Sequence, residues 1–297
     1  MPEKDLSEKY LESYNDVFAD IVNVLLYQGK QIVLENELSD AGTETQYKAD
    51  GKIHQQTRDT SKYWEKHAKI ALFGIENQST IDKDMILRVL GYDGASYRKQ
   101  LSENTVNKTI KHPEPYPVIT IILYFGTKRW NAPRTLHERI SIPEALKPYV
   151  SDYHINIFEI AYLTEEQLQL FQSDFRIIAD YFVQIRKNKN YIPSPEIIRH
   201  VDALLQMLHA LTGDNRFELS CNRKKGESIT MCEVLDQVEN RGIKKGMKAG
   251  ISQGILAFVK LCQEFGCSAE ETADRLMKEF HLTKEAADTN IARYWLK

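Results

Sequence analysis

Two short apolar runs constrain the fold of this chain most strongly. The segments KIALFGIEN at 69–77 and VITIILYFG at 118–126 are apolar at most positions. A strand with one buried face alternates apolar and polar residues, whereas a strand that is apolar throughout is buried on both faces. The two runs therefore predict central strands of a sheet that helices cover.

The rest of the chain predicts an α/β fold that becomes all-helical toward the C-terminus. Apolar residues at helical spacing predict helices at 6–26, 82–103, 165–187 and 195–211. Further strands are predicted at 57–64 and 154–163. We expect a mixed sheet flanked by helices at 1–163, a helical accessory region at 164–230 and a helical tail at 231–297.

Composition excludes some classes of protein. The chain has 297 residues, of which 27% are charged, and its formal net charge is -3. This charge excludes a uniformly basic nucleic-acid binder but allows a local basic patch. The first ten residues, MPEKDLSEKY, lack the apolar region of a signal peptide, and no apolar run approaches the roughly 20 residues of a membrane helix. We expect a cytoplasmic protein without membrane contacts.

Neither the cysteines nor the tail indicates a site by itself. The four cysteines form no CxxC pair, which favours structural thiols and leaves a zinc site as the alternative. In the tail, glycine recurs at every fourth residue: 242, 246, 250 and 254. Because each glycine weakens a helix by about 1 kcal/mol, this row needs a reason. Close approach of a partner helix, as in a homo-oligomer, and an exposed linker helix both remain open.

A carboxylate at the end of the first apolar run is the strongest chemical signal. Glu76 follows five apolar or glycine positions, and its charge would be costly there without a partner or a metal ion. Gln78 points to the same side of the strand because side chains alternate. Asp59, on the predicted strand 57–64, would lie across from Glu76 in a hairpin. A divalent cation would relieve the repulsion between these two acids.

The ordered set of segments around these residues resembles a known family. RD at 58–59, GIENQ at 74–78 and RVLGYD at 88–93 resemble the Rpn family of recombination-promoting nucleases. These proteins are also called YhgA-like transposases and belong to the PD-(D/E)XK nuclease superfamily. FADIVN at 18–23, PVITIILYFG at 117–126 and MCEVLDQVENRGIKKG at 231–246 extend the resemblance from about residue 10 to about residue 250.

The resemblance implies a role for each motif residue. It implies a PD-(D/E)XK restriction-endonuclease-like core in which Asp59 and Glu76 hold Mg²⁺ or Mn²⁺. The backbone carbonyl of Asn77 would be a further ligand. Gln78 stands where the superfamily usually has a lysine that activates the attacking water. A glutamine can position a water by hydrogen bonds but does not supply the positive charge of that lysine.

Three more residues match the family pattern around this site. Arg88 and Tyr92 form an RxxxY pattern on the predicted helix 82–103, where Arg88 could hold a phosphate. Asp20 resembles an acid of the first helix that assists the metal ion. For Asp20, a structural bond to Asn23 or to a neighbouring amide is the alternative.

A basic stretch provides a candidate surface for nucleic acid. Seven cationic residues lie between 98 and 134, with only Glu103 and Glu114 opposing them, and Tyr116 and Trp130 interleaved. The seven are Arg98, Lys99, Lys108, Lys111, Lys128, Arg129 and Arg134. Positive charge binds the phosphate backbone, and aromatic rings can stack on exposed bases. A solvated charged loop is the alternative.

These observations predict a Mg²⁺-dependent DNA endonuclease of low sequence specificity, linked to recombination or mobile elements. The main alternative is a module that keeps the nuclease fold, has lost the chemistry and acts by binding DNA or protein. A glycosidase with two carboxylates is a third class, but the basic stretch and the lack of an aromatic-rich sugar platform near Glu76 favour a nuclease.

Overall fold

The computed structural model describes residues 11–49, 52–106, 114–215, 217 and 229–295. The chain divides into two compact units, Met1–Cys232 and Glu233–Lys297. Among the described residues, no helix combines the length and the apolar composition that crossing a bilayer requires.

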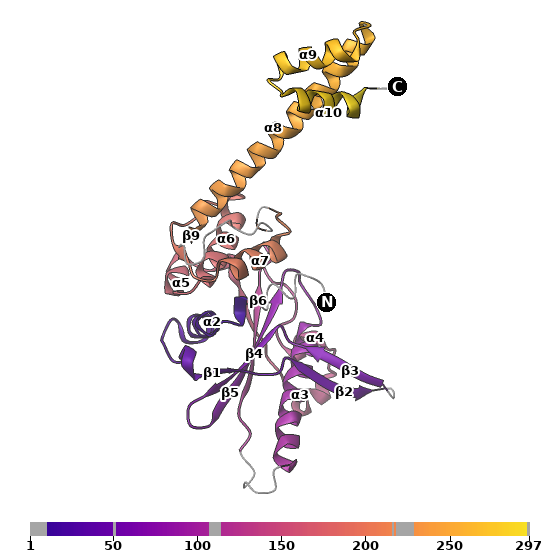
Figure 1. Ribbon diagram of the computed structural model, residues 1–297. Coiled ribbons are helices and arrows are strands. Elements are labelled where there is room, and N and C mark those ends of the chain that lie inside the picture. The colour runs from indigo at the N-terminus through magenta and orange to yellow at the C-terminus, as the bar shows by residue number, and fades with distance from the viewer. Residues whose placement is uncertain (1–10, 50–51, 107–113, 216, 218–228, 296–297) are drawn as a thin grey trace. The chain divides into compact units, whose positions relative to one another are not determined.

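A five-stranded mixed sheet forms the centre of the first unit (Figure 1). Its order is β1 (Leu38–Asp40), β4 (Thr60–Glu65), β5 (Lys69–Gln78), β6 (Val118–Tyr124) and β7 (Asn156–Glu159). The pairs β1–β4 and β4–β5 are antiparallel, whereas β5–β6 and β6–β7 are parallel. The two apolar runs are therefore neighbouring strands inside the sheet, as predicted.

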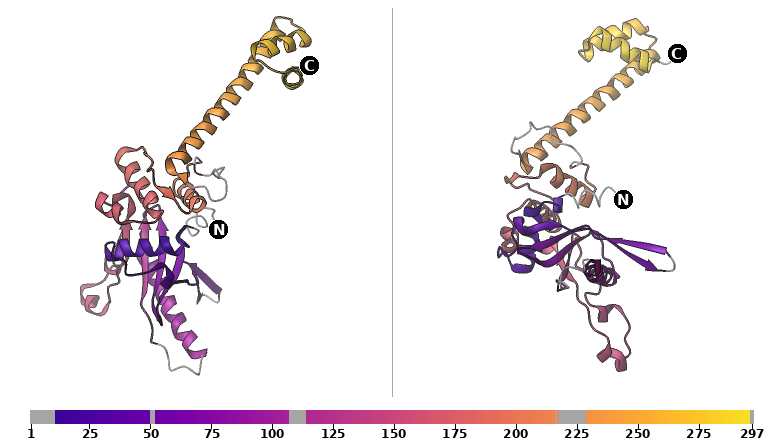
Figure 2. Two further views of the ribbon diagram at one scale, coloured as in Figure 1. Left: turned by 60° about the vertical axis from the view of Figure 1, so that its left-hand side comes forward. Right: turned by 60° about the horizontal axis from the view of Figure 1, so that its bottom comes forward.

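Helices cover both faces of this sheet, as Figure 2 shows from two sides. On one face, α3 (Met85–Val106) buries Met85 and Val89 against Ile122 and other residues of the core. The opposite face bears α2 (Asn15–Tyr27) and α6 (Phe175–Asn188), where Phe125 at the end of β6 packs on Phe175 with ring centroids 6.4 Å apart. The α/β prediction, with a mixed sheet flanked by helices, is confirmed.

Several predicted elements have different bounds. The strand predicted at 57–64 is split between β3 (Lys52–Thr57), which pairs with β2 (Glu44–Ala49), and β4. Asp59 lies in the bend between them rather than on a strand. The strand predicted at 154–163 ends at Glu159 because its partner β6 ends at Tyr124, and the chain continues as the short helix η3 (Ile160–Tyr162).

The helix predicted at 165–187 is also two helices. The first, α5 (Glu165–Leu170), begins at the predicted capping box of Thr164 and Gln167, and α6 follows after a turn. The remaining elements are η1 (Glu35–Glu37), α4 (Leu136–Arg139), η2 (Glu144–Tyr149), β8 (Ile197–Ile198), α7 (Val201–Thr212) and β9 (Ile229–Thr230).

The second unit is helical, as predicted for the tail. It contains most of α8 (Met231–Glu264), with α9 (Ala269–Glu279) and α10 (Lys284–Tyr294). Close approach explains one glycine of the row, since a side chain at Gly254 would lie 3.3 Å from Phe280. A side chain at 242, 246 or 250 would meet no described atom within 4 Å. Within this unit, those three glycines face open space.

Gly126→Ala is expected to destabilise the first unit by about 1–3 kcal/mol, the usual cost of overpacking. A Cβ at Gly126 would lie 2.1 Å from the hydroxyl oxygen of Tyr124, and this ring is buried against Trp130 with centroids 5.1 Å apart. Urea denaturation measures the loss. The control is Gly94→Ala in α3, which has open space and should stabilise by roughly 0.5–1 kcal/mol. Equal stability of Gly126→Ala and wild type would contradict the packing argument.

Candidate active site

Asp59 and Glu76 lie at the same end of neighbouring strands. The β4–β5 register pairs Thr60 with Ile75, so Asp59, one residue before β4, lies opposite Glu76. The Oδ2 atom of Asp59 accepts a hydrogen bond of 2.7 Å from the backbone N–H of Asn77. Glu76 is only 2% exposed. The hairpin therefore brings the two predicted acids together, although Asp59 is in the bend.

Helix α3 adds Arg88 and Tyr92 to these acids. Nη2 of Arg88 lies 3.3 Å from Oε2 of Glu76 and 3.3 Å from the hydroxyl oxygen of Tyr92. Burial raises the pKa of Tyr92, and the charges of Glu76 and Asp59 raise it further. The hydroxyl of Tyr92 therefore lies in the field of both acids and remains protonated at neutral pH.

Gln78 occupies the last position of β5, two residues after Glu76. The parallel register aligns it with Tyr124 of β6, which in turn aligns with Glu159 of β7. These three residues form the carboxyl-terminal edge of the parallel strands. In open α/β sheets, ligands bind beyond this edge.

Glu12 is a buried acid of this region that the sequence pattern did not reveal. Its Oε2 atom accepts hydrogen bonds from Nδ2 of Asn77 at 3.1 Å and from the hydroxyl of Thr60 at 3.4 Å. Thr60 and Asn77 flank Asp59 and Glu76 on the two strands. Through these two side chains, Glu12 connects the neighbouring strand ends that present the two acids. A single glutamate in a polar N-terminal segment carries no signal of this contact.

A buried ion pair joins the motif segments behind the acids. Arg58, which is 2% exposed, donates to Asp93 at 2.5 Å and to Ser96 at 2.7 Å. Thr120 and Tyr153 also donate to the carboxylate of Asp93. The RD segment and the end of RVLGYD are therefore bonded to each other, about 35 residues apart in the chain.

Gly74, in the GIENQ segment, provides the space for this ion pair. A Cβ at Gly74 would lie 2.6 Å from Cδ of Arg58. The Arg58 side chain thus crosses the strand directly over Gly74. All three motif segments of the resemblance meet at one place in the fold.

The donor atoms at this edge suit a hard divalent cation. Among the described residues, no group of three or more His, Cys, Asp or Glu could hold a metal ion. Mg²⁺ commonly uses only one or two carboxylates and keeps several waters, so the pair Asp59 and Glu76 is sufficient. In an extended strand the N–H and C=O of one residue point to the same side, which directs the carbonyl of Asn77 toward the side of Asp59.

Comparison with known families assigns the chain. The model of the family described as "Putative transposase, YhgA-like" matches residues 65–214, half of the chain. The chain belongs to this family. The match includes Glu76, Gln78, Arg88 and Tyr92 but begins after Asp59. A search of the curated proteins found no match, and neither did a search of the solved structures.

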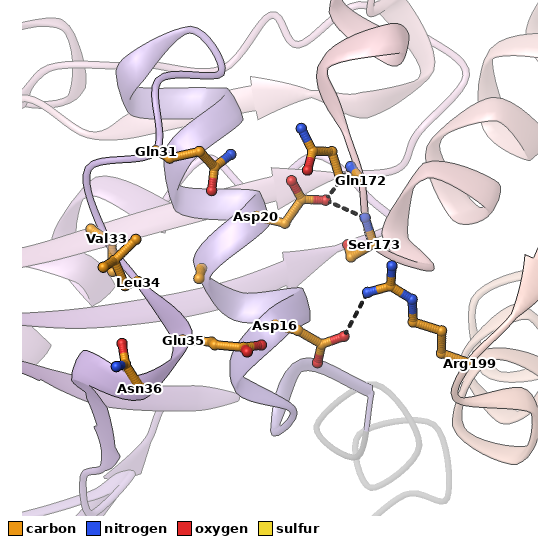
Figure 3. Close-up of a pocket in the computed structure, with 11 residues that line it drawn as sticks. Asp16, Asp20, Gln31, Val33, Leu34, Glu35, Asn36, Gln172, Ser173 and Arg199 are labelled. Carbon is orange, nitrogen blue, oxygen red and sulfur yellow. Dashed lines mark hydrogen bonds and ion pairs between the residues drawn. The ribbon is translucent and has the colours of Figure 1, made fainter.

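Asp20 lies apart from the other residues expected at the site of this YhgA-like chain. Its Oδ2 atom accepts hydrogen bonds from the backbone N–H groups of Gln172 at 2.9 Å and Ser173 at 2.7 Å (Figure 3). These bonds attach α2 to the turn between α5 and α6. Asp20 thus has the bond to neighbouring amides that its structural alternative predicts, and it lines a separate pocket.

The cationic side chains of the basic stretch differ in how they are paired. Arg98, Lys99 and Lys128 are exposed. Arg129 and Arg134 both pair with Glu159, at 3.4 Å and 3.0 Å, which the spacing of charges along the chain did not reveal. The two remaining lysines, Lys108 and Lys111, lie outside the described residues.

The expectation that Trp130 stacks on bases is wrong. Trp130 is 6% exposed and belongs to the core beneath α3, where it packs edge-on against Tyr124. Tyr116 is half-buried and packs edge-on against Tyr63, with ring centroids 6.0 Å apart. The two aromatic residues of the basic stretch therefore pack against residues of the sheet.

Proposed function

We propose that this chain is a Mg²⁺-dependent endonuclease that hydrolyses phosphodiester bonds of DNA with low sequence specificity. We place its role in recombination or in mobile elements, in line with the transposase family. The observation that carries the proposal is the meeting of Asp59 and Glu76 at the edge of the parallel strands, beside Arg88. Two carboxylates and a guanidinium suit a phosphodiester whose charge must be offset.

Each residue has a distinct role in the proposed reaction. Asp59, Glu76 and the carbonyl of Asn77 hold the metal ion, which when bound supplies a Lewis acid next to the scissile phosphate. Gln78 holds the attacking water through its amide. Arg88 is 38% exposed, so its guanidinium can reach a phosphate oxygen while the helix keeps it near Glu76.

Exposed cations of the basic stretch hold the DNA in this proposal. Arg98, Lys99 and Lys128 contact the phosphate backbone without reading bases, which accounts for low specificity. Binding should weaken steeply with salt, since each neutralised phosphate releases counterions.

Nicking of supercoiled plasmid by the purified full-length protein tests the proposal. We expect conversion to the open circle with Mg²⁺ or Mn²⁺ and none with EDTA. A matched preparation of Glu76→Gln excludes contaminating nucleases. Absence of metal-dependent nicking by wild type over a broad range of pH and salt would overturn the endonuclease assignment.

One contact favours a second candidate, a nuclease-fold module without catalysis. Arg88 already compensates the charge of Glu76, and Gln78 lacks the charge of the usual lysine. Such a module would bind DNA or a protein but would have no need of a metal ion. Calorimetric titration of the protein with Mn²⁺ separates the two candidates. Mn²⁺ binding by the wild type that is lost in Glu76→Gln supports the nuclease. No Mn²⁺ binding by the wild type supports the module.

Gln78→Lys is expected to accelerate nicking by about tenfold, because a charged donor makes stronger hydrogen bonds to an anion or a water than a neutral amide. Initial rates at saturating Mg²⁺ measure the gain. Gln253→Lys, at an exposed position of α8 in the second compact unit, adds the same charge outside the site and should leave the rate unchanged. A gain of equal size in both variants would indicate a general effect of charge on DNA binding.

A further inference from the structure

A cavity of about 460 Å³ lies beside α2 (Figure 3). None of the residues that line it belongs to the candidate active site. The cavity walls come from three parts of the first unit: α2, the segment 31–36, and the turn at 172–173, with Arg199 at the border. Small-molecule sites typically have volumes of about 300–1,000 Å³ and combine apolar walls with a few polar groups. The size of this cavity therefore suits an organic ligand.

The charges of the lining select a cationic ligand. Asp16, Asp20 and Glu35 contribute three carboxylates, against the single guanidinium of Arg199. Arg199 is itself directed to Asp16, at 3.8 Å. An excess of negative charge disfavours a phosphate or a nucleic acid. Because Asp16 already pairs with Arg199, a cation in this cavity would be bound mainly by Asp20 and Glu35.

Asp20 gives the cavity a fixed acceptor at its base. The side chain is only 6% exposed, and its Oδ2 atom accepts hydrogen bonds from both backbone N–H groups of the turn at 172–173. The other carboxylate oxygen is turned toward the space between Gln31 and Gln172 (Figure 3). Burial raises the pKa of Asp20, and hydrogen bonds from Ser173 and Gln172 oppose part of this rise by stabilising the ionised carboxylate. A bound cation would stabilise it further.

The acceptors are arranged for a planar group with several donors. The amide oxygen of Gln172 faces the space above Asp20, and Glu35 lies at another wall. Gln31 borders the space from the other side, with its amide oxygen accepting from Nδ2 of Asn23 at 3.4 Å. A guanidinium has five N–H donors in one plane, whereas an ammonium has three at a point. Leu34, which is 44% exposed, adds apolar surface for a methylene stem.

We infer that this cavity is a binding site for a guanidinium group, carried by a small molecule or by an arginine side chain of a peptide. Asp20 is its main acceptor and Glu35 its second anionic contact. The site is independent of the proposed nuclease, because none of its residues holds the metal ion or the water there. Failure of one proposal therefore leaves the other unchanged.

Agmatine, a guanidinium with a flexible amine stem, is the probe for the full-length protein. We expect saturable binding by calorimetry and an increase of Tm by about 2 °C or more at saturation, since a ligand of the folded state stabilises it. Putrescine, which replaces the guanidinium by a second amine, should bind at least tenfold more weakly. Equal binding of the two compounds, or no binding of agmatine, would overturn the assignment.

Two variants test the site itself. Asp20→Asn keeps an oxygen for the two backbone N–H groups and should weaken agmatine by about tenfold or more. Glu35→Gln, at an exposed position without risk to the fold, should weaken it a few-fold. Glu144→Gln in η2 makes the same change outside the cavity and should have no effect. Unchanged affinity in both cavity variants would contradict the site.

A second ligand, the blocked peptide acetyl-Gly-Arg-Gly-amide, tests whether the guanidinium belongs to a small molecule or to an arginine side chain of a peptide. Binding of both ligands supports a site that accepts an arginine side chain. Binding of agmatine alone supports a site for a free small molecule. Binding of neither overturns the inference.

Discussion

Glu76→Gln and Asp59→Asn are each expected to reduce metal-dependent nicking of DNA by at least about 100-fold, since loss of groups that merely orient metal ligands already costs roughly 10–100-fold. Each substitution removes one of two carboxylates at the edge of the parallel strands and keeps the size of the side chain. In Asp59→Asn, the side-chain oxygen can still accept a hydrogen bond from the backbone N–H of Asn77, so the bend at position 59 keeps this bond. Initial rates of plasmid nicking at several Mg²⁺ concentrations measure the loss.

Matched controls separate chemistry from folding in this experiment. Asp274→Asn and Glu279→Gln make the same changes at exposed positions of α9, in the other compact unit, and should retain full activity. Urea denaturation should show that both site variants are folded. Full activity of a folded Glu76→Gln or Asp59→Asn protein would contradict the assignment of that acid to the metal ion.

Arg58→Leu is expected to lower the free energy of unfolding by about 3–5 kcal/mol, the cost of leaving a buried charge without its partner. Asp93, the partner of Arg58, has a side chain that is only 5% exposed. The hydroxyls of Thr120 and Tyr153 would remain as donors to Asp93 but carry no charge. Urea denaturation followed by circular dichroism measures the change.

A second buried cation of the same sheet provides the control. Lys62 is 1% exposed and pairs with Asp40, whose side chain is 84% exposed. When Lys62 is replaced by leucine, Asp40 stays in water, so Lys62→Leu should cost clearly less than Arg58→Leu. In addition, Arg58→Leu combined with Asp93→Leu should recover part of the loss, since no buried charge remains. Equal losses in Arg58→Leu and Lys62→Leu would contradict the argument.

Local patterns predicted the elements that determine the type of fold. The runs at 69–77 and 118–126 form β5 and β6, and the helix predicted at 82–103 forms α3 at Met85–Val106. A strand buried on both faces and an amphipathic helix each have a periodicity that a short window reveals. The capping box at Thr164 and Gln167 is equally local, because both hydrogen bonds lie within one turn.

Contacts between residues far apart in the chain explain where the structure differs from the sequence-based predictions. The bend at Asp59 depends on where the β2–β3 hairpin ends and β4 begins, and the end of β7 depends on the length of β6. Trp130 was expected at a surface, yet its ring fills a space beneath α3 that no neighbour in the sequence defines. Glu159 pairs with both Arg129 and Arg134 from a strand about 25–30 residues away.

The sequence by itself determined the family, the α/β architecture and Glu76 as an acid at the end of a buried strand, because these depend on residue types at fixed spacings. Only the tertiary structure decided which groups meet there. Strand register brings Asp59 opposite Glu76, Glu12 reaches Asn77 across 65 residues, and Arg58 crosses Gly74 to bond Asp93. Hydrogen bonds and ion pairs act over a few ångströms in space, so chain spacing does not encode them directly.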